Sequence, residues 1–225
     1  MKYLIFDSGP LINFSMNGLL YLLEPLHKKF KVEFLITKEV RKEIIDNPQN
    51  IKRFELGALR LLAIFKKGVI KHADLTKNEV DELRKIRDNL MQIGNSTFKA
   101  KGADIHLINK GEAAALALSI IMKNKTGVNA PLVIDERTTR MLCENPENLR
   151  NLLEKKLHSN VKANRANYDF FKHFKIIRST EIAYIAHKNN LVELKDQRVL
   201  EAILYGLKFN GCSISEREVE EMSGM

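Results

Sequence analysis

Four carboxylates occupy positions where the sequence predicts that a strand ends or a helix begins: Asp7, Glu43, Glu112 and Asp135. Asp7 directly follows the apolar run KYLIF, and Asp135 directly follows PLVI. Residues just beyond the carboxyl ends of parallel strands line the crevice in which α/β proteins bind ligands, so acids placed there converge. Several anions packed together raise one another's pKa unless a cation compensates them. The pattern therefore predicts a site for divalent metal ions.

Magnesium or manganese is the metal that this set of ligands predicts. Both ions prefer hard oxygen ligands, keep some of their water and bridge the oxygens of substrate phosphates. They also lower the pKa of a bound water toward that of a usable nucleophile. The expected reaction is hydrolysis of a phosphodiester bond by in-line attack of water.

Each acid also has a simpler explanation. Glu39 and Glu112 lie near predicted helix starts, where a carboxylate complements the helix dipole by about 0.3 to 1 kcal/mol. Glu39 and Glu43 are one turn apart on the same helix face, so either could enter the site, and Glu43 could equally be a solvated helix acid. Asp7 and Asp135 are harder to explain in this way. A carboxylate that follows a buried strand is costly without a ligand or hydrogen-bond donors.

Short apolar strands alternate with helices along the chain. The expected strands cover residues 2–6, 32–36, 69–72, 132–134 and 175–178. Thr37 and Thr76 stand at N-cap positions, and Gly111 opens a helix that continues to Lys123. The alternation predicts a three-layer α/β/α fold with a mainly parallel central sheet of about five strands, as one domain over residues 1–225.

Two polar segments interrupt this pattern. Residues 93–110 are rich in Gly, Ser, Asn and Lys, which predicts a loop or a small excursion. Residues 143–175 are strongly basic with helical tendency, which predicts an inserted helical arm. The arm could bind substrate through Lys155, Lys156, Lys162, Arg165 and Lys172, or it could only stabilise the protein against heat.

The formal net charge of the 225-residue chain is +9, which favours polyanionic partners such as nucleic acid. A Lys- and Glu-rich surface of the kind found in thermophiles would explain the charge equally well. The 44% hydrophobic content is enough for a packed core. The uncharged stretch 113–122 is too short to span a bilayer, and Asp7 interrupts any signal-peptide core, so we expect a cytoplasmic protein. Cys143 and Cys212 lie far apart without nearby zinc ligands, which argues against a disulfide framework or a zinc site.

Four sequence blocks together resemble a known family. IFDSGPLI, ITKEVRKEII, INKGEAAALALS and LVIDERTTRML, in this order, are similar to the four acidic motifs of PIN-domain ribonucleases, including the toxins of toxin-antitoxin pairs. The segments KNNLVE and ILYGLKFNGCSIS look like the C-terminal part of one prokaryotic subgroup. The resemblance implies that Asp7, Glu43, Glu112 and Asp135 bind Mg²⁺ or Mn²⁺ and that RNA is the substrate. It also raises an antitoxin protein as a partner. The apolar helices, independently of the resemblance, favour a homodimer.

The resemblance implies roles for neighbouring residues as well. Ser8 is the hydroxyl neighbour of the first acid, Glu136 is a further acid near the metal ligands, and Thr180 follows the last strand. Arg140 stands where such domains often carry an arginine near phosphate, although a surface helix arginine is an equal alternative.

Two features depart from the family pattern. Asn109 replaces an acid that often precedes the glycine, and the segment 143–174 is longer than a minimal PIN domain needs. The alternative to a nuclease is a PIN fold that binds RNA or a protein without cutting.

Overall fold

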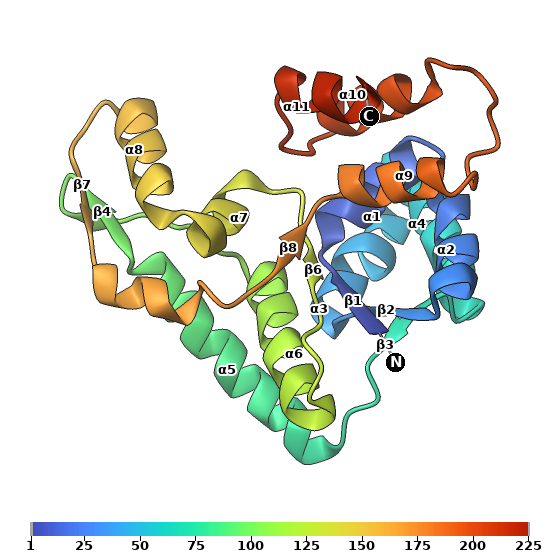
Figure 1. Ribbon diagram of the computed structural model, residues 1–225. Helices are drawn as coiled ribbons and strands as arrows, with labels where there is room; N and C mark the ends of the chain where they lie inside the picture. The colour runs from blue at the N-terminus through green and yellow to red at the C-terminus, as the bar shows by residue number, and fades with distance from the viewer. Residues whose placement is uncertain (1, 225) are drawn as a thin grey trace.

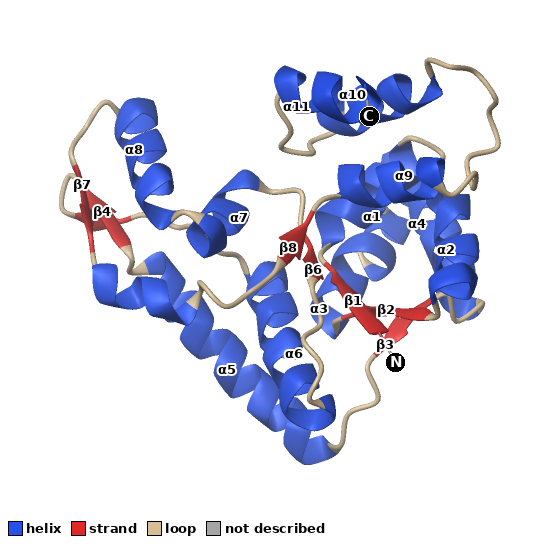
Figure 2. Ribbon diagram, viewed as in Figure 1, coloured by secondary structure: helices blue, strands red, loops and turns tan. Residues whose placement is uncertain are grey.

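The computed structural model describes residues 2–224 and has five parallel strands in one central sheet (Figures 1 and 2). The strands are β1 (Lys2–Phe6), β2 (Val32–Ile36), β3 (Ile70–His72), β6 (Leu132–Val133) and β8 (Ile176–Ile177). Their order is β3-β2-β1-β6-β8. The predicted three-layer α/β fold is confirmed, and the strand order reverses between β1 and β6.

Helices cover both faces of the sheet, and the strand residues alternate between two hydrophobic cores. On one face lie α1 (Ser8–Met16), α2 (Leu23–Phe30), α4 (Lys52–Lys66) and α9 (Ser179–Lys188). The other face is covered by α5 (Lys77–Asn95) and α6 (Lys110–Thr126). Phe6 packs into the first core, whereas its neighbour Ile5 packs into the second. Burial on both faces explains why these strands are apolar throughout.

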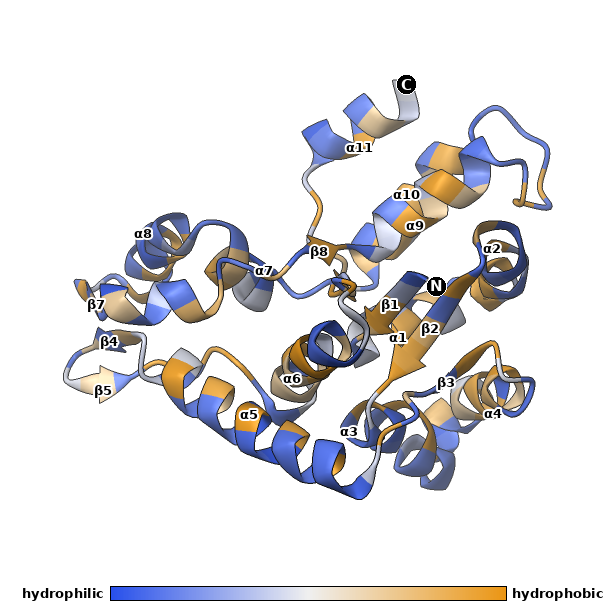
Figure 3. Ribbon diagram, turned by 60° about the horizontal axis from the view of Figure 1, so that its bottom comes forward, coloured by the Kyte–Doolittle hydropathy of each residue, from blue (hydrophilic) through white to orange (hydrophobic). Residues whose placement is uncertain are grey.

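The two predicted N-cap residues, Thr37 and Thr76, both cap helices in the structure. The hydroxyl of Thr37 accepts a hydrogen bond from the backbone of Val40 at the start of α3 (Lys38–Arg41). Thr76 and Glu79 form a capping box on α5. Hydrophilic residues line one side of α5 and hydrophobic residues the other, so its apolar side faces α6 and the core (Figure 3).

The predicted arm is less helical than expected. It follows α7 (Arg137–Glu144) and contains α8 (Pro146–Leu157), β7 (Val161–Ala163) and the 3₁₀ turn η4 (Arg165–Phe170). The segment expected as a loop supplies β4 (Phe98–Ala100) and β5 (Ala103–Asp104), which join β7 in an antiparallel sheet of order β5-β4-β7. Lys101 and Gly102 both have positive φ, 50° and 85°, and make the turn between β4 and β5. We call residues 95–105 and 145–175 the lobe (Figure 1).

The chain ends with α10 (Val199–Phe209) and α11 (Glu216–Gly224), and α10 packs against α9 (Figure 1). Ser215 and Glu218 form a capping box before α11. Shorter helical segments are η1 (Leu20–Leu22), the π-helical η2 (Lys42–Asp46) and η3 (Pro48–Asn50). Within residues 2–224, no helix combines the length and the apolar character needed to cross a membrane.

Candidate metal centre

Asp7 and Asp135 lie side by side, as predicted, because β1 and β6 are neighbours. The register pairs Phe6 with Val133, and the backbone N–H of Asp7 donates to the carbonyl of Val133 at 3.0 Å. Both side chains are buried, with 4% and 3% of their surface exposed. A side chain at Gly9 would lie 3.8 Å from Asp7 Oδ2 and 3.9 Å from the Cβ of Asp135. Gly9 therefore sits against both acids at the point where the strand order reverses.

One carboxylate oxygen of Asp7 has no hydrogen-bond partner among residues 2–224. The residue immediately precedes α1, which begins at Ser8, so Pro10 is the third helical residue. Burial raises the pKa of Asp7 to about 6, against the lowering effect of the nearby backbone N–H groups of Ser8 and Gly9. The charges of Glu43 and Asp135 raise this pKa further. Oδ1 of Asp7 is buried without a hydrogen-bond partner, a costly state that a bound cation would relieve.

Glu112 caps α6 and also belongs to the acid cluster. Its Oε2 accepts from the backbone N–H of Asn109 at 2.8 Å, and its own N–H donates to Asn109 Oδ1 at 2.9 Å. Asn109, the departure from the family pattern, is therefore the N-cap of this helix. Burial raises the pKa of Glu112 to about 8, and the charges of Asp7 and Glu136 contribute. The buried hydroxyl of Thr139 has no hydrogen-bond partner and lies close enough to Glu112 to lower this pKa slightly.

Glu43, and not Glu39, reaches the cluster. The π-helical turn η2 directs its carboxylate against Gly111, where a Cβ would lie 2.7 Å from Oε1 and 2.9 Å from Oε2. Glu39 is instead paired with Arg87, with 2.6 Å between Oε1 and Nη1. The charge of Glu43 contributes to the raised pKa of Asp7. Unlike the other three acids, Glu43 is exposed, so it gives the buried carboxylates a solvent-facing neighbour.

Asp135 is held in place by three hydrogen bonds. Asn13 Nδ2 donates to Oδ2 at 3.0 Å, the backbone N–H of Ser179 to Oδ1 at 2.8 Å, and the Ser179 hydroxyl to Oδ2 at 2.7 Å. Ser179 thus holds the acid where the sequence indicated Thr180, whose buried hydroxyl bonds to Glu181. Ser8 is partly buried beside Asp7. No sequence signal pointed to Asn13, which lies in the middle of α1.

The segment between α10 and α11 holds the backbone of Asp135 through a hydrogen bond. The N–H of Ser213 donates to the carbonyl of Asp135 at 3.0 Å. The carbonyl of Ser213 accepts from Arg178 at 3.0 Å and from Arg140 at 3.3 Å, and Arg178 also pairs with Glu218 of α11. Arg140 therefore has a structural partner, so this structure does not hold it free for phosphate.

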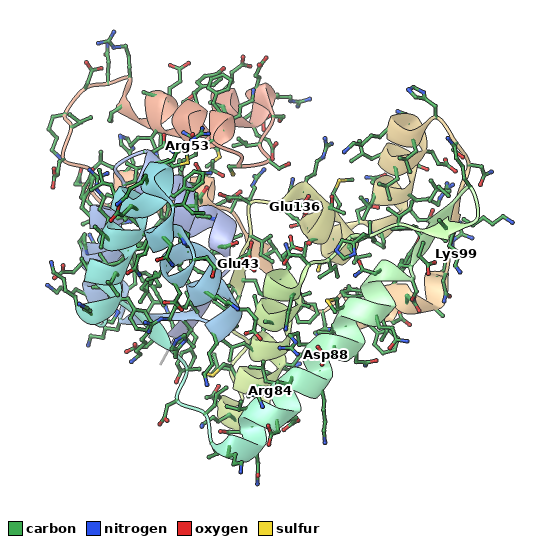
Figure 4. The ribbon with its side chains drawn as sticks, turned by 180° about the vertical axis from the view of Figure 1, so that it is seen from behind. Glu43, Arg53, Arg84, Asp88, Lys99 and Glu136 are labelled. Carbon is green, nitrogen blue, oxygen red and sulfur yellow. The ribbon has the colours of Figure 1, made fainter. Side chains whose placement is uncertain are left out.

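The remaining predicted residues lie at different distances from the acids. The carboxylate of Glu136 caps α7 by accepting from the backbone of Thr139 at 2.7 Å, and its charge raises the pKa of Glu112. Figure 4 shows Glu43 and Glu136 at the junction between the sheet and the lobe. Lys155, Lys156 and Lys162 are exposed on the lobe and do not join the acid cluster.

The cluster fits a hard divalent cation in the chemistry of its donors. Asp7 Oδ1 lacks a partner, burial and mutual repulsion raise two of the four pKa values, and glycines leave room beside the carboxylates. Within residues 2–224, no three His, Cys, Asp or Glu side chains stand together as a ready set of ligands. Asp7, Glu43, Glu112 and Asp135 are the residues that would hold the ion.

Substitution of Gly111 by Ala should weaken metal binding without lowering the stability of the protein. The new methyl group would meet the Glu43 carboxylate at 2.7 Å and displace it, so we expect Mn²⁺ affinity to fall by about tenfold or more, as for loss of a partner of a metal ligand. Helix stability should not fall, because Ala is a better helix former than Gly by about 1 kcal/mol. Isothermal titration with Mn²⁺ and thermal unfolding measure the two effects. Gly224→Ala, which meets nothing within 4 Å, is the matched control. Unchanged Mn²⁺ affinity in Gly111→Ala would remove Glu43 from the site.

Comparison of the chain with protein-family models, with curated proteins and with solved structures gave no match.

Proposed function

We propose that this protein is a metal-dependent ribonuclease that hydrolyses RNA phosphodiester bonds with Mg²⁺ or Mn²⁺. The observation that carries the proposal is that Asp7 and Asp135 lie side by side at the carboxyl ends of β1 and β6, with one buried oxygen of Asp7 unpaired. The charges of Glu43 and Asp135 raise the pKa of Asp7, and the charge of Asp7 raises the pKa of Glu112. The resemblance of the four acidic blocks to PIN-domain ribonucleases supports it. An antitoxin partner remains a prediction of that resemblance, and a homodimer remains a prediction from the apolar helices.

Each acid of the site has a separate role that suits hydrolysis. Asp135 is oriented by Asn13 and Ser179 and so presents its carboxylate in a fixed direction. The proton that Glu112 holds near neutral pH, because its pKa is raised to about 8, would leave when a cation binds. The metal ion, when bound, supplies an activated water and neutralises charge on the phosphate. Glu43, being exposed, lies where substrate can approach.

Two glutamates on one helical stretch provide the sharpest test of this proposal. Glu43→Gln should reduce Mn²⁺-dependent cleavage of a labelled RNA by at least ~10 to 100-fold, the range for partners of metal ligands. Glu39→Gln should leave the cleavage rate nearly unchanged and lower the melting temperature, because it breaks the pair with Arg87. EDTA should stop cleavage by the wild type. Equal rates for Glu43→Gln and Glu39→Gln would contradict the assigned roles.

A non-catalytic RNA-binding protein is the second candidate, and the exposed lysines of the lobe favour it. It predicts no turnover with any divalent ion and RNA retention that weakens as salt rises. Cleavage that EDTA stops and Mn²⁺ restores would exclude this candidate.

A further inference from the structure

The positive charge of the chain is concentrated in the lobe. Its 42 residues contain nine Lys or Arg and four Asp or Glu, a net charge of +5 out of the +9 of the whole chain. The other 183 residues carry only +4. A surface that is uniformly Lys-rich would spread the charge in proportion to length, so composition alone does not explain this distribution.

The acids of the lobe are all neutralised by neighbouring cations. Asp104 pairs with Lys99 at 3.2 Å, Asp169 with Lys172 at 2.7 Å, and Glu154 with Arg150 at 2.8 Å. Glu147 pairs with both Arg150 and Arg165. Among the residues that the structure describes, five exposed lysines of the lobe take part in no ion pair: Lys101, Lys155, Lys156, Lys162 and Lys175. Their charges are available to a partner.

The small antiparallel sheet places two cations directly opposite each other. Lys162 of β7 pairs in register with Lys99 of β4, whereas the adjacent Phe98 and Val161 are buried. Like charges directly opposite on neighbouring strands destabilise the pair. Asp104 on the far side of Lys99 compensates only one of them. A polyanion lying on this face would compensate both.

The end of α8 brings two more lysines to the same part of the lobe. The backbone N–H of Val161 donates to Glu154 Oε1 at 3.0 Å, which ties the last turn of α8 to the start of β7. Lys155 and Lys156 lie in this last turn, where they also complement the helix dipole. The dipole does not account for Lys162 or Lys101, which lie outside any helix.

The two helices between the acids and the lobe lysines set an upper limit on the distance between them. α7 begins next to Glu136 and is followed directly by α8, which ends at Lys156 and Leu157. At 1.5 Å per residue the two helices add up to at most about 30 Å. Helical nucleic acid advances about 3.4 Å per step along each strand, so this span covers up to about nine steps. Figure 4 shows Lys99 on the lobe in the same view as Glu43 and Glu136.

We propose that the lobe is a binding site for the phosphate backbone of RNA, separate from the acid cluster. It holds a segment of the substrate several nucleotides from the bond to be cut. A role of the lobe in cleavage rests on the proposed ribonuclease function. Binding of RNA by the lobe does not depend on that function. The lobe therefore favours long RNA over short oligonucleotides by lowering the KM for long substrates.

A triple substitution tests the site by binding alone. Lys155→Gln, Lys156→Gln and Lys162→Gln are combined, and affinity for a fluorescent 30-nucleotide RNA hairpin is measured by anisotropy in EDTA between 50 and 300 mM KCl. Each lost phosphate contact lowers the slope of log affinity against log salt by about 0.7 to 0.9, so we expect a slope smaller by about 2 to 3. The affinity at 100 mM KCl should fall by at least about tenfold.

The matched control removes the same charge from the body of the protein. Lys66, Lys77 and Lys85 are exposed and make no ion pair with any residue from 2 to 224. Their triple change to Gln should alter RNA affinity by less than about twofold. Equal losses in the two triple variants would overturn the proposal. Wild-type affinity for duplex DNA equal to that for RNA would overturn RNA as the partner.

Cleavage in Mn²⁺ separates this inference from the proposed function. The lobe variant should raise the KM for the hairpin and leave cleavage of a four-nucleotide RNA unchanged. A binding defect in the lobe variant without cleavage by any form supports the lobe and refutes the nuclease. Cleavage with the same KM for wild type and lobe variant refutes the lobe and leaves the nuclease standing.

Discussion

Replacement of Asp7 by Asn should reduce Mn²⁺-dependent RNA cleavage by at least ~100-fold. Asn keeps the shape of the side chain but cannot supply the negative charge at the position of the unpaired Oδ1. Single groups that position a metal or stabilise the transition state contribute about 10²- to 10³-fold in other enzymes. The rate is measured on a labelled RNA at saturating Mn²⁺.

The same variant should not be less stable than the wild type in EDTA. The pKa of Asp7 is raised from 3.8 to about 6, so its charge is unfavourable in the folded protein at pH 8. Each pKa unit corresponds to about 1.4 kcal/mol, so its removal should stabilise the metal-free protein by on the order of 1 to 3 kcal/mol. Asp74→Asn is the matched control, because Asp74 is exposed and only its backbone carbonyl accepts a hydrogen bond. An Asp7→Asn protein that is folded and cleaves RNA at the wild-type rate would refute the metal site.

The metal-free protein should lose stability as the pH rises from about 5 to 8.5. The folded pKa values of Asp7, about 6, and of Glu112, about 8, lie above their ordinary values of 3.8 and 4.5. The folded state therefore binds more protons than the unfolded state in this window, and the free energy of unfolding falls with pH until both groups are ionised. At about 1.4 kcal/mol per pKa unit, the fall should be on the order of several kcal/mol. Urea denaturation in EDTA at pH 5 and 8.5 measures it.

Saturating Mn²⁺ should remove most of this pH dependence, because the cation stabilises the ionised carboxylates. The pKa values of Glu147 and Glu218 are lowered to about 2, so their effects fall below pH 5 and outside the measured range. The lowered pKa of His173 acts in the opposite direction, and the His173→Asn background removes it. A double variant of Asp7→Asn and Glu112→Gln should show a flat profile in EDTA. Stability of the wild type in EDTA that rises from pH 5 to 8.5 would contradict the burial of these charges.

The sheet and two of the acids could be predicted because they depend on local sequence. An apolar run of five residues before Asp7 and a shorter one before Asp135 mark strand ends, and parallel pairing of β1 with β6 brings those ends together. The choice of Glu43 over Glu39 had no such local signal and came from the family resemblance. Its physical cause lies in contacts distant in sequence, since Arg87 holds Glu39 and Gly111 makes room for Glu43.

Other parts of the structure depend on pairings that a single sequence does not reveal. Strands of two or three residues, such as β4, β5 and β7, are too short to show a period of two, and β4 and β7 are about 60 residues apart. The neighbour of Asp135 is Ser179 and not Thr180 because the end of β8 fixes which residue enters the first turn of α9. Arg140 bonds to a carbonyl 73 residues away, which changes its expected role.

The hydrogen bonds that hold Asp135 in place have a consequence for the order in which the protein folds. Asn13, Ser179 and Ser213 come from the beginning, the last quarter and the end of the described chain, and Asn13 is 122 residues from Asp135. Contacts between such distant segments form late, because the entropy of closing long loops opposes them until other structure is in place. A chain that has formed β1, β2 and their helices still lacks an oriented Asp135. We therefore expect the acid cluster to be assembled in the last steps of folding.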